Sequence, residues 1–292
     1  MIRTPRTSTS DLFRHQMERS SARVRRAEEQ AVTGFKVNRA SDAPTVIREV
    51  HAVSAGSADQ AVYKDNAGSA GMLHSTMDTS LERAQDIVVR LRELAVQMSS
   101  DAVDANGRAA AAVEVRSLQA SMLDTANTQV GGRYVFAGAV YDAPAFDATY
   151  TYQGDANDPE TRVGQDRWVR TGLDGQAVFQ GGTDIFATIE NLAVALETNN
   201  VPATRASLPD LESSTRQLSQ WRSVVGSEQA TAEDSVVVAE SLDQLFTDRL
   251  SQLVQVDPVA AYTELGEAQN AYTTTLQVIA STRTESLFDM LR

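Results

Sequence analysis

Histidine is the residue type in this chain best suited to metal binding or proton transfer. His15, His51 and His74 are its three copies, and no short spacing links them. Metal ligation needs several side chains that converge on one point, and the sequence shows no such pattern around any of the three. We therefore expect surface or helix-edge histidines and no metal site.

Other candidate chemistry is equally sparse. The acidic stretch Asp155 to Glu160 lacks the spacing of a calcium-binding loop, so we expect it to be solvated. Gly131-Gly132 lacks the following helix and the Lys-Ser/Thr ending of a phosphate-binding loop, so we expect a plain turn. Cysteine is absent, which excludes a disulfide scaffold and a thiolate nucleophile. We expect neither an enzyme nor a cofactor, and we expect core packing from Met17, Met72, Met77, Met98 and Met122.

Composition and charge exclude further classes of protein. The 292 residues carry a net charge of −13, whereas a nucleic-acid binder needs a surplus of Lys and Arg. No run approaches 18 apolar residues, and the first residues lack the apolar stretch of a secretory signal, so we expect no membrane insertion. Residues 1–50 carry a net charge of +4 and residues 233–292 one of −7, so the two ends are complementary in charge.

The N-terminal arm reads as a heptad helix followed by a compact break. Apolar or small residues recur at alternating spacings of four and three, which indicates a helix that needs a partner. The predicted N-terminal assembly seam consists of Phe13, Met17, Val24, Ala27 and Ala31. Gly34 is expected to end this helix, and Ser41 or Asp42 to cap the next one with Pro44 in its first turn. The predicted interdomain loop residues are Gly34, Lys36, Asn38, Ser41, Asp42 and Pro44.

The C-terminal arm carries a comparable stripe. Asp257-Pro258 is expected to start a last helix, with Leu265, Ala268 and Tyr272 on one face. The predicted C-terminal assembly seam consists of Leu276, Ile279, Leu287, Phe288 and Leu291.

Between the arms, a long helix is predicted from a stripe of Leu81, Ala84, Val88, Leu91, Ala95 and Met98, followed by a polar turn over residues 101–107 and a third helix. Glycine and aromatic residues then predict short strands, including alternating runs at Tyr134–Phe136 and Phe146–Tyr152. Helical spacing returns near Phe186, with one helix near residues 208–225 and another near 239–253.

We therefore predict a mainly α fold, a long helical bundle or coiled coil with a small inserted antiparallel β domain. The expected organisation is a core helix over 1–40 that pairs with one over 258–292, rod halves over 41–130 and 184–257, and a β domain over 131–183.

Three segments resemble the flagellin superfamily. T-G-F-K-V-N-R-A-S-D-A-P, residues 33–44, is similar to its N-terminal signature, although the commoner form has S-D-D-P. A-N-T-Q-V-G-G-R-Y-V-F-A-G, residues 126–138, resembles the hook-associated branch that forms the hook–filament junction. The ending S-L-F-D-M-L, residues 286–291, is similar to that branch too, with Met290 in place of an aromatic residue.

The resemblance implies a structural, non-enzymatic subunit of the bacterial flagellum. It implies export through the flagellar channel without a cleaved signal peptide, with an export chaperone that also binds the C-terminal region. It further implies a ring of copies between the hook-side junction protein and flagellin, with paired terminal helices at its core. Filament flagellin itself is the nearest alternative. A cytoplasmic coiled-coil scaffold is the alternative from another class.

Overall fold

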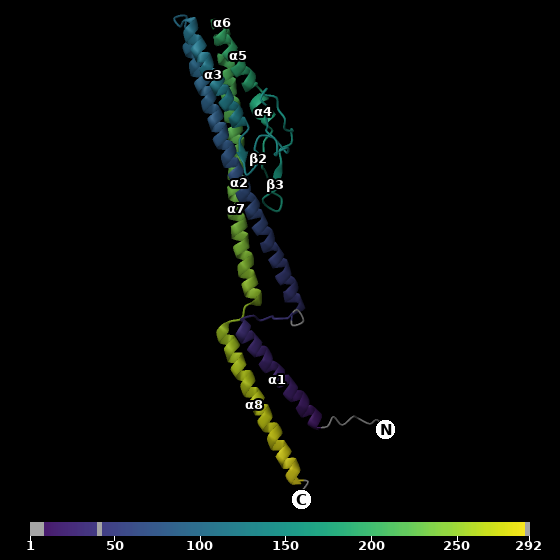
Figure 1. The fold of residues 1–292 in the computed structure, drawn as a ribbon. Coiled ribbons are helices and arrows are strands. Elements are labelled where there is room, and N and C mark those ends of the chain that lie inside the picture. The colour runs from purple at the N-terminus through teal and green to yellow at the C-terminus, as the bar shows by residue number, and fades with distance from the viewer. Residues whose placement is uncertain (1–8, 40–42, 290–292) are drawn as a thin grey trace. The chain divides into compact units, whose positions relative to one another are not determined.

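A computed structural model of the chain describes residues 9–39 and 43–289, with side chains for residues 11–39 and 43–281. The described part is mainly helical with four short strands, as Figure 1 shows, so the predicted fold class is confirmed. The chain divides into two compact units. One is formed by residues 1–58 and 243–292, here called the terminal unit, and the other by residues 59–242, here called the central unit.

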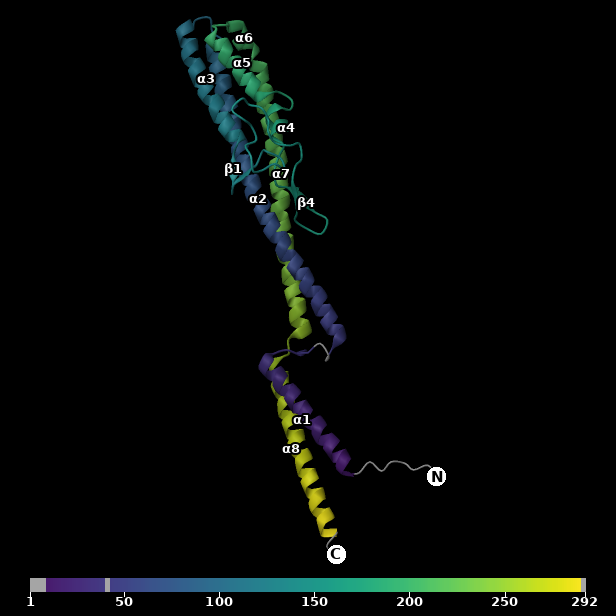
Figure 2. The ribbon, with the colours of Figure 1, turned by 45° about the vertical axis from the view of Figure 1, so that its right-hand side comes forward.

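Long helices form the core of the central unit. The larger parts of α2 (Pro44–Met98) and α7 (Leu208–Val254) lie there beside α3 (Ala105–Ala126) and α5 (Ile185–Glu197), as Figures 1 and 2 show. The stripe predicted over residues 81–98 is buried as expected, since its apolar side chains face this core. The fully buried residues include Met77, Leu81, Leu91, Met122, Ile189, Leu192 and Leu218.

The turn between α2 and α3 is shorter than predicted. The Asp104 carboxylate accepts a hydrogen bond of 2.8 Å from the Gly107 N–H and caps α3, which therefore begins at Ala105. The predicted polar turn through Gly107 is wrong in its second half for this reason.

Two antiparallel hairpins lie between α3 and α4 (Gly175–Gln180). The first pairs β1 (Gln129–Val130) with β2 (Arg133–Tyr134), and the second pairs β3 (Glu160–Arg162) with β4 (Trp168–Arg170). Loops between them pack around an aromatic cluster in which ring centroids lie 5.1 to 6.1 Å apart. This cluster consists of Phe136, Phe146, Phe179 and Phe186.

The predicted strand at Phe146–Tyr152 is wrong, because its ends meet in a single bridge. The Asp147 carboxylate accepts hydrogen bonds from the N–H groups of Thr149 and Thr151, which turns the chain. Tyr150 has a φ of 64° within this turn. A local side-chain acceptor therefore overrides the alternating pattern.

Helix α7 is continuous from Leu208 to Val254, after the short α6 (Val201–Ala206), so the two separate helices predicted there are one. Its middle buries only small residues, namely Ala232, Ser235 and Ala239, which leaves no pronounced apolar stripe to read. Gly226 stays within the helix with nothing within 4 Å of an added Cβ atom.

In the terminal unit, α1 (Thr9–Thr33) lies beside α8 (Pro258–Asp289), as both Figures 1 and 2 show. The start of α2 and the end of α7 meet at Gly56, where a Cβ atom would lie 2.9 Å from the Phe246 ring. A larger residue at this position would therefore require the Phe246 ring to shift. Among the described residues, no helix contains a stretch that is both long enough and apolar enough to cross a membrane.

Candidate assembly surfaces

The contact between α1 and α8 is built from small residues. Ala27 is 3%, Ala261 4% and Ala268 0% exposed. Alanines at this contact let two helices approach closely but bury little apolar area. Half-buried residues extend the line at alternating spacings of three and four, namely Val24 and Ala31 on α1, and Leu265, Tyr272, Thr275 and Ile279 on α8.

The predicted seam residues differ in burial. In the N-terminal set, Ala27 is buried, Phe13, Val24 and Ala31 are half-buried, and Met17 is 38% exposed. In the C-terminal set, Ile279 is half-buried, whereas Leu276 is 40% exposed because Thr275 takes the heptad position beside it. Leu287, Phe288 and Leu291 lie outside the residues whose side chains are described. The role of all of these residues in assembly stays a prediction.

Large apolar side chains of the terminal unit remain outside this seam. Tyr262 is 63% exposed and Val278 52%, although both lie on the helix that carries the buried alanines. Exposed apolar residues that gather on one element are typical of a protein–protein contact surface. The others on the described parts of α1 and α8 are Leu12, Met17, Val32, Val259 and Leu276.

The predicted interdomain loop forms a small ladder with the segment that joins α7 to α8. The Lys36 N–H donates to the Val254 carbonyl at 2.7 Å, and the Val256 N–H donates to the Gly34 carbonyl at 2.9 Å. The Lys36 ammonium group also donates to the Gln252 carbonyl at 3.4 Å. The break after α1 therefore pairs with the break between α7 and α8, and each satisfies the backbone groups of the other.

Local contacts shape the loop on its own side. Gly34 has a φ of 75°, which ends α1 in the left-handed conformation as predicted. The Thr33 hydroxyl lies 3.1 Å from the Asn38 amide oxygen, so this pair closes the turn. Pro44 is the first residue of α2, as predicted, whereas Ser41 and Asp42 lie outside the described residues.

Charge contributes less to the helix pair than the sequence suggests. Arg23 and Glu264 form the ion pair recorded between the described parts of α1 and α8, at 3.8 Å. Both side chains are more than half exposed, and such pairs contribute about 0–1 kcal/mol. The recorded ion pair therefore adds little to the stability of this contact.

The segment 126–138 owes its residue pattern to the fold of the β region. The Asn127 side chain accepts from the Phe146 N–H and donates to the Phe146 carbonyl, both at 2.9 Å. Gly131 and Gly132 have φ values of 57° and 84°, which suit the tight turn between β1 and β2. The predicted plain turn at these glycines is confirmed.

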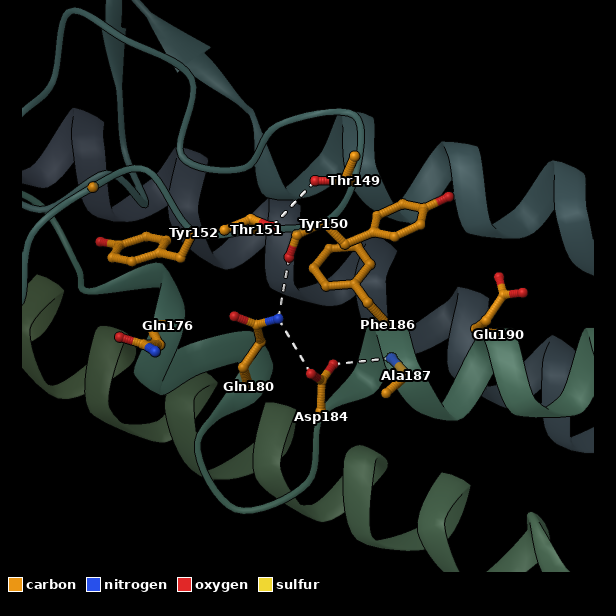
Figure 3. A pocket seen from close by; sticks show the side chains of 11 residues that line it. Thr149, Tyr150, Thr151, Tyr152, Gln176, Gln180, Asp184, Phe186, Ala187 and Glu190 are labelled. Carbon is orange, nitrogen blue, oxygen red and sulfur yellow. Dashed lines mark hydrogen bonds between the residues drawn. The ribbon is translucent and has the colours of Figure 1, made fainter.

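A cavity of about 600 Å³ opens beside the β region (Figure 3). Tyr150 and Phe186 stack at its edge with ring centroids 5.1 Å apart. The Gln180 amide donates to the Tyr150 carbonyl and to Asp184, each at 3.2 Å, while Asp184 caps α5 through the Ala187 N–H. These polar groups are occupied with one another, which favours a structural role over ligand binding.

His74 contradicts the expectation of a surface or helix-edge histidine. Its side chain is 1% exposed, and neither ring nitrogen has a hydrogen-bond partner among the described residues. Desolvation by this burial lowers the pKa of His74. Met72, also expected in the core, is 66% exposed instead, because the neighbouring Leu73 faces inward.

Two buried polar residues that hold the fold escaped the sequence analysis. Gln217 accepts from the N–H groups of Gly182 and Thr183 and donates to the Val178 carbonyl, which fastens the end of α4 to α7. Arg108 of α3 is 4% exposed, and its guanidinium donates to the Met98 carbonyl at the end of α2 at 3.0 Å. Their burial depends on contacts between distant segments, which no local pattern reveals.

The described residues contain no group of three or more His, Asp or Glu side chains that could hold a metal ion.

Paired terminal arms, long central helices and an inserted β region together make up the described fold. Residues 8–140 match the sequence family described as the bacterial flagellin N-terminal helical region. No curated protein sequence matches the chain.

Solved structures of hook-associated proteins share the fold. A protein from Vibrio parahaemolyticus described as a flagellar hook-associated protein aligns with a TM-score of 0.67 at 17% identity, over 73% of this chain and 99% of its own. FlgL from Bacillus cereus aligns with a TM-score of 0.61 at 18% identity, over 68% and 99%. Hook-associated protein 3 from Legionella pneumophila aligns with a TM-score of 0.63 at 14% identity, over 70% and 98%.

Proposed function

We propose that this chain is a structural subunit of the bacterial flagellum that assembles with copies of itself at the hook–filament junction. The observation that carries the proposal is the terminal unit, in which an alanine seam pairs α1 with α8 while larger apolar side chains stay exposed. The flagellin-type region over residues 8–140 and the shared fold of hook-associated proteins support it.

The exposed residues supply an energetic reason to assemble. Covering a Val, Leu or Tyr side chain contributes up to about 1.5–3 kcal/mol, and less where it is already partly covered. Val259, Tyr262, Leu276 and Val278 are 40% to 74% exposed, so several such contributions are available on α8 alone. Assembly would therefore stabilise a helix pair that buries little by itself.

The partners follow from this role. The subunit contacts other copies in a ring, a hook-side junction protein on one side and flagellin on the other. An export chaperone protects its C-terminal region, and the chain leaves the cell through the flagellar channel. We infer a structural role in motility, with no catalytic step and no cofactor.

Filament flagellin is the second candidate, favoured by the family match over residues 8–140. Abundance separates the two, because a filament needs many more copies than a thin junction. Quantitative mass spectrometry of sheared flagella decides between them. A cytoplasmic scaffold is excluded if the chain is found in those flagella at all.

Deletion of the gene gives the first test. A junction subunit predicts cells with hooks but no filaments, and flagellin released into the medium, as seen by electron microscopy and immunoblotting. Normal filaments in the deletion strain would falsify the proposal.

The double change Tyr262→Asp, Leu276→Asp tests the surface itself. Both residues are exposed, so we expect the helix content and melting temperature of the purified chain to change little, while hooks lose their filaments. The double change Gln269→Asp, Asn270→Asp is the matched control, because it places the same charges at exposed polar positions of α8. Full motility of the Tyr262/Leu276 variant would show that this face makes no essential contact.

A further inference from the structure

His74 lies where the second hairpin meets the long helices of the central unit. This hairpin, β3–β4, contributes Val163 and Val169 to a small apolar cluster with Ala67 and Ala70 of α2 and Ala232 of α7. The cluster is separate from the main core. The hairpin therefore docks through little apolar area, so polar contacts supply much of its attachment.

Polar contacts complete the attachment. The Arg170 guanidinium donates to the Glu228 carboxylate of α7 at 3.0 and 3.1 Å, and to Asp158 at 3.2 Å. The Asn66 amide of α2 donates to the Arg162 carbonyl at 2.8 Å. These bonds join the strands to both helices.

His74 faces this attachment without a hydrogen-bond partner. The main chain of Arg170 in β4 approaches its ring, and Glu228 of α7 and the Arg170 side chain are the charged groups that act on it. On its own helix the next acidic residue, Asp78, is engaged by Arg222 at 2.9 Å. The ring is 1% exposed, so a proton added to it has no water to solvate the charge.

We propose that His74 makes the docking of the β3–β4 hairpin depend on pH, with the neutral imidazole permitting docking and the protonated one releasing it. Burial lowers the pKa of His74, so the undocked ring binds a proton more readily than the docked ring. Docking is then at full strength above the ordinary histidine pKa of about 6.5 and weakens as the pH falls below it. The main chain of Arg170 and, to a smaller extent, the negative charge of Glu228 oppose this effect but only partly, because the net shift of the His74 pKa remains downward.

The absence of cysteine allows a direct test in the full chain. Val169→Cys places a thiol at a position that is 1% exposed while the hairpin is docked, and Trp168→Cys places one at a neighbouring position that is 56% exposed. A dipyridyl disulfide, which reacts with thiols in mild acid, labels each variant separately. The labelling rate of the Val169→Cys chain divided by that of the Trp168→Cys chain measures undocking and removes the pH dependence of the reagent.

We expect this ratio to rise up to about tenfold for each pH unit below 6.5, as one proton is taken up on release. In a His74→Met background the ratio should stay flat between about pH 5 and 7.5, where carboxylates of ordinary pKa remain ionised. His74→Gln, which also cannot titrate, serves as a second background in case the methionine variant packs poorly. His15 and His51 are present in all variants, so their titration is common to all.

Two outcomes would overturn the proposal. An equal rise in the histidine and methionine backgrounds would assign the pH dependence to other groups, with Glu228→Gln as the variant that identifies them. A flat ratio with His74 present would show that its protonation does not release the hairpin.

Discussion

Arg108 offers the sharpest test of what holds the end of the central unit together. Its guanidinium donates to the Met98 carbonyl at 3.0 Å, to the Ser100 carbonyl at 2.8 Å and to the Asn199 side chain. The first two acceptors lie at the C-terminus of α2, where unpaired carbonyl groups favour a positive charge. Arg108, which belongs to α3, therefore caps the C-terminus of α2. Its bond to Asn199 also holds the turn that follows α5.

The change Arg108→Met removes all three bonds and leaves buried acceptors without donors. A hydrogen bond to a charged group contributes about 1.5–3 kcal/mol, but the buried charge also costs desolvation, so the sum is not additive. We expect the free energy of unfolding to fall by about 3–5 kcal/mol. With a urea m-value of about 2 kcal/mol/M, the unfolding midpoint falls by about 1.5–2.5 M.

Tryptophan fluorescence reports this change selectively, because Trp168 and Trp221 both lie in the central unit. Arg205→Met is the matched control. Arg205 donates to the Ser99 carbonyl and to Asp101 at the same helix end, but its side chain is 52% exposed, so we expect a loss below about 1 kcal/mol. If Arg108→Met unfolds within about 0.5 kcal/mol of the parent chain, the buried network does not hold this end and the reasoning is refuted.

Two further changes probe the connections. Gln217→Leu should lower the free energy of unfolding of the central unit by about 2–4 kcal/mol in the same fluorescence assay. The reason is that it leaves the N–H groups of Gly182 and Thr183 and the Val178 carbonyl without this partner. The control change Gln220→Leu, at an exposed position, should alter stability little. Gly34→Val should destabilise the loop ladder by about 1–2 kcal/mol through its φ of 75° alone, since a Cβ atom there meets nothing within 4 Å. Hydrogen exchange of the Lys36 and Val256 amides measures this loss. A Gly34→Asn control should retain most protection, and equal protection in all three chains would contradict the backbone argument.

The helices were predictable wherever large apolar residues repeat. The stripe from Leu81 to Met98 faces a core, and that core consists of Leu, Ile, Val and Met, so periodicity and burial coincide. The break at Gly34 was equally visible, because few residues other than glycine adopt its conformation.

Two features were not predictable from apolar spacing, namely the continuity of α7 and the turn at Asp147. The middle of α7 buries Ala232, Ser235 and Ala239 against other elements, and none of these stands out from a polar sequence. A helix continues there although its hydrophobic stripe does not. In the β region, the Asp147 side chain determines a turn that alternation alone reads as a strand.

The burial of His74 could not be predicted from its neighbours in the sequence. It directly follows Leu73 and stands three residues before Met77, both of which are buried, so helical spacing permits either the core or its edge. The ring is buried in the structure, where the main chain of Arg170 in β4, far along the chain, approaches it. No local pattern contains that information.

The two units use apolar side chains differently, and this difference bears on assembly. The central unit buries Leu, Ile, Phe and Met within the chain, whereas the described contact between α1 and α8 buries mainly alanine. Alanine burial gains little against a backbone ordering cost of about 1–2 kcal/mol per residue, so the helix pair is the less stable part of a single chain. Val259, Tyr262 and Val278 would repay part of that cost only when another chain covers them. Contact with another chain would therefore supply free energy for ordering the arms that the single chain does not supply by itself.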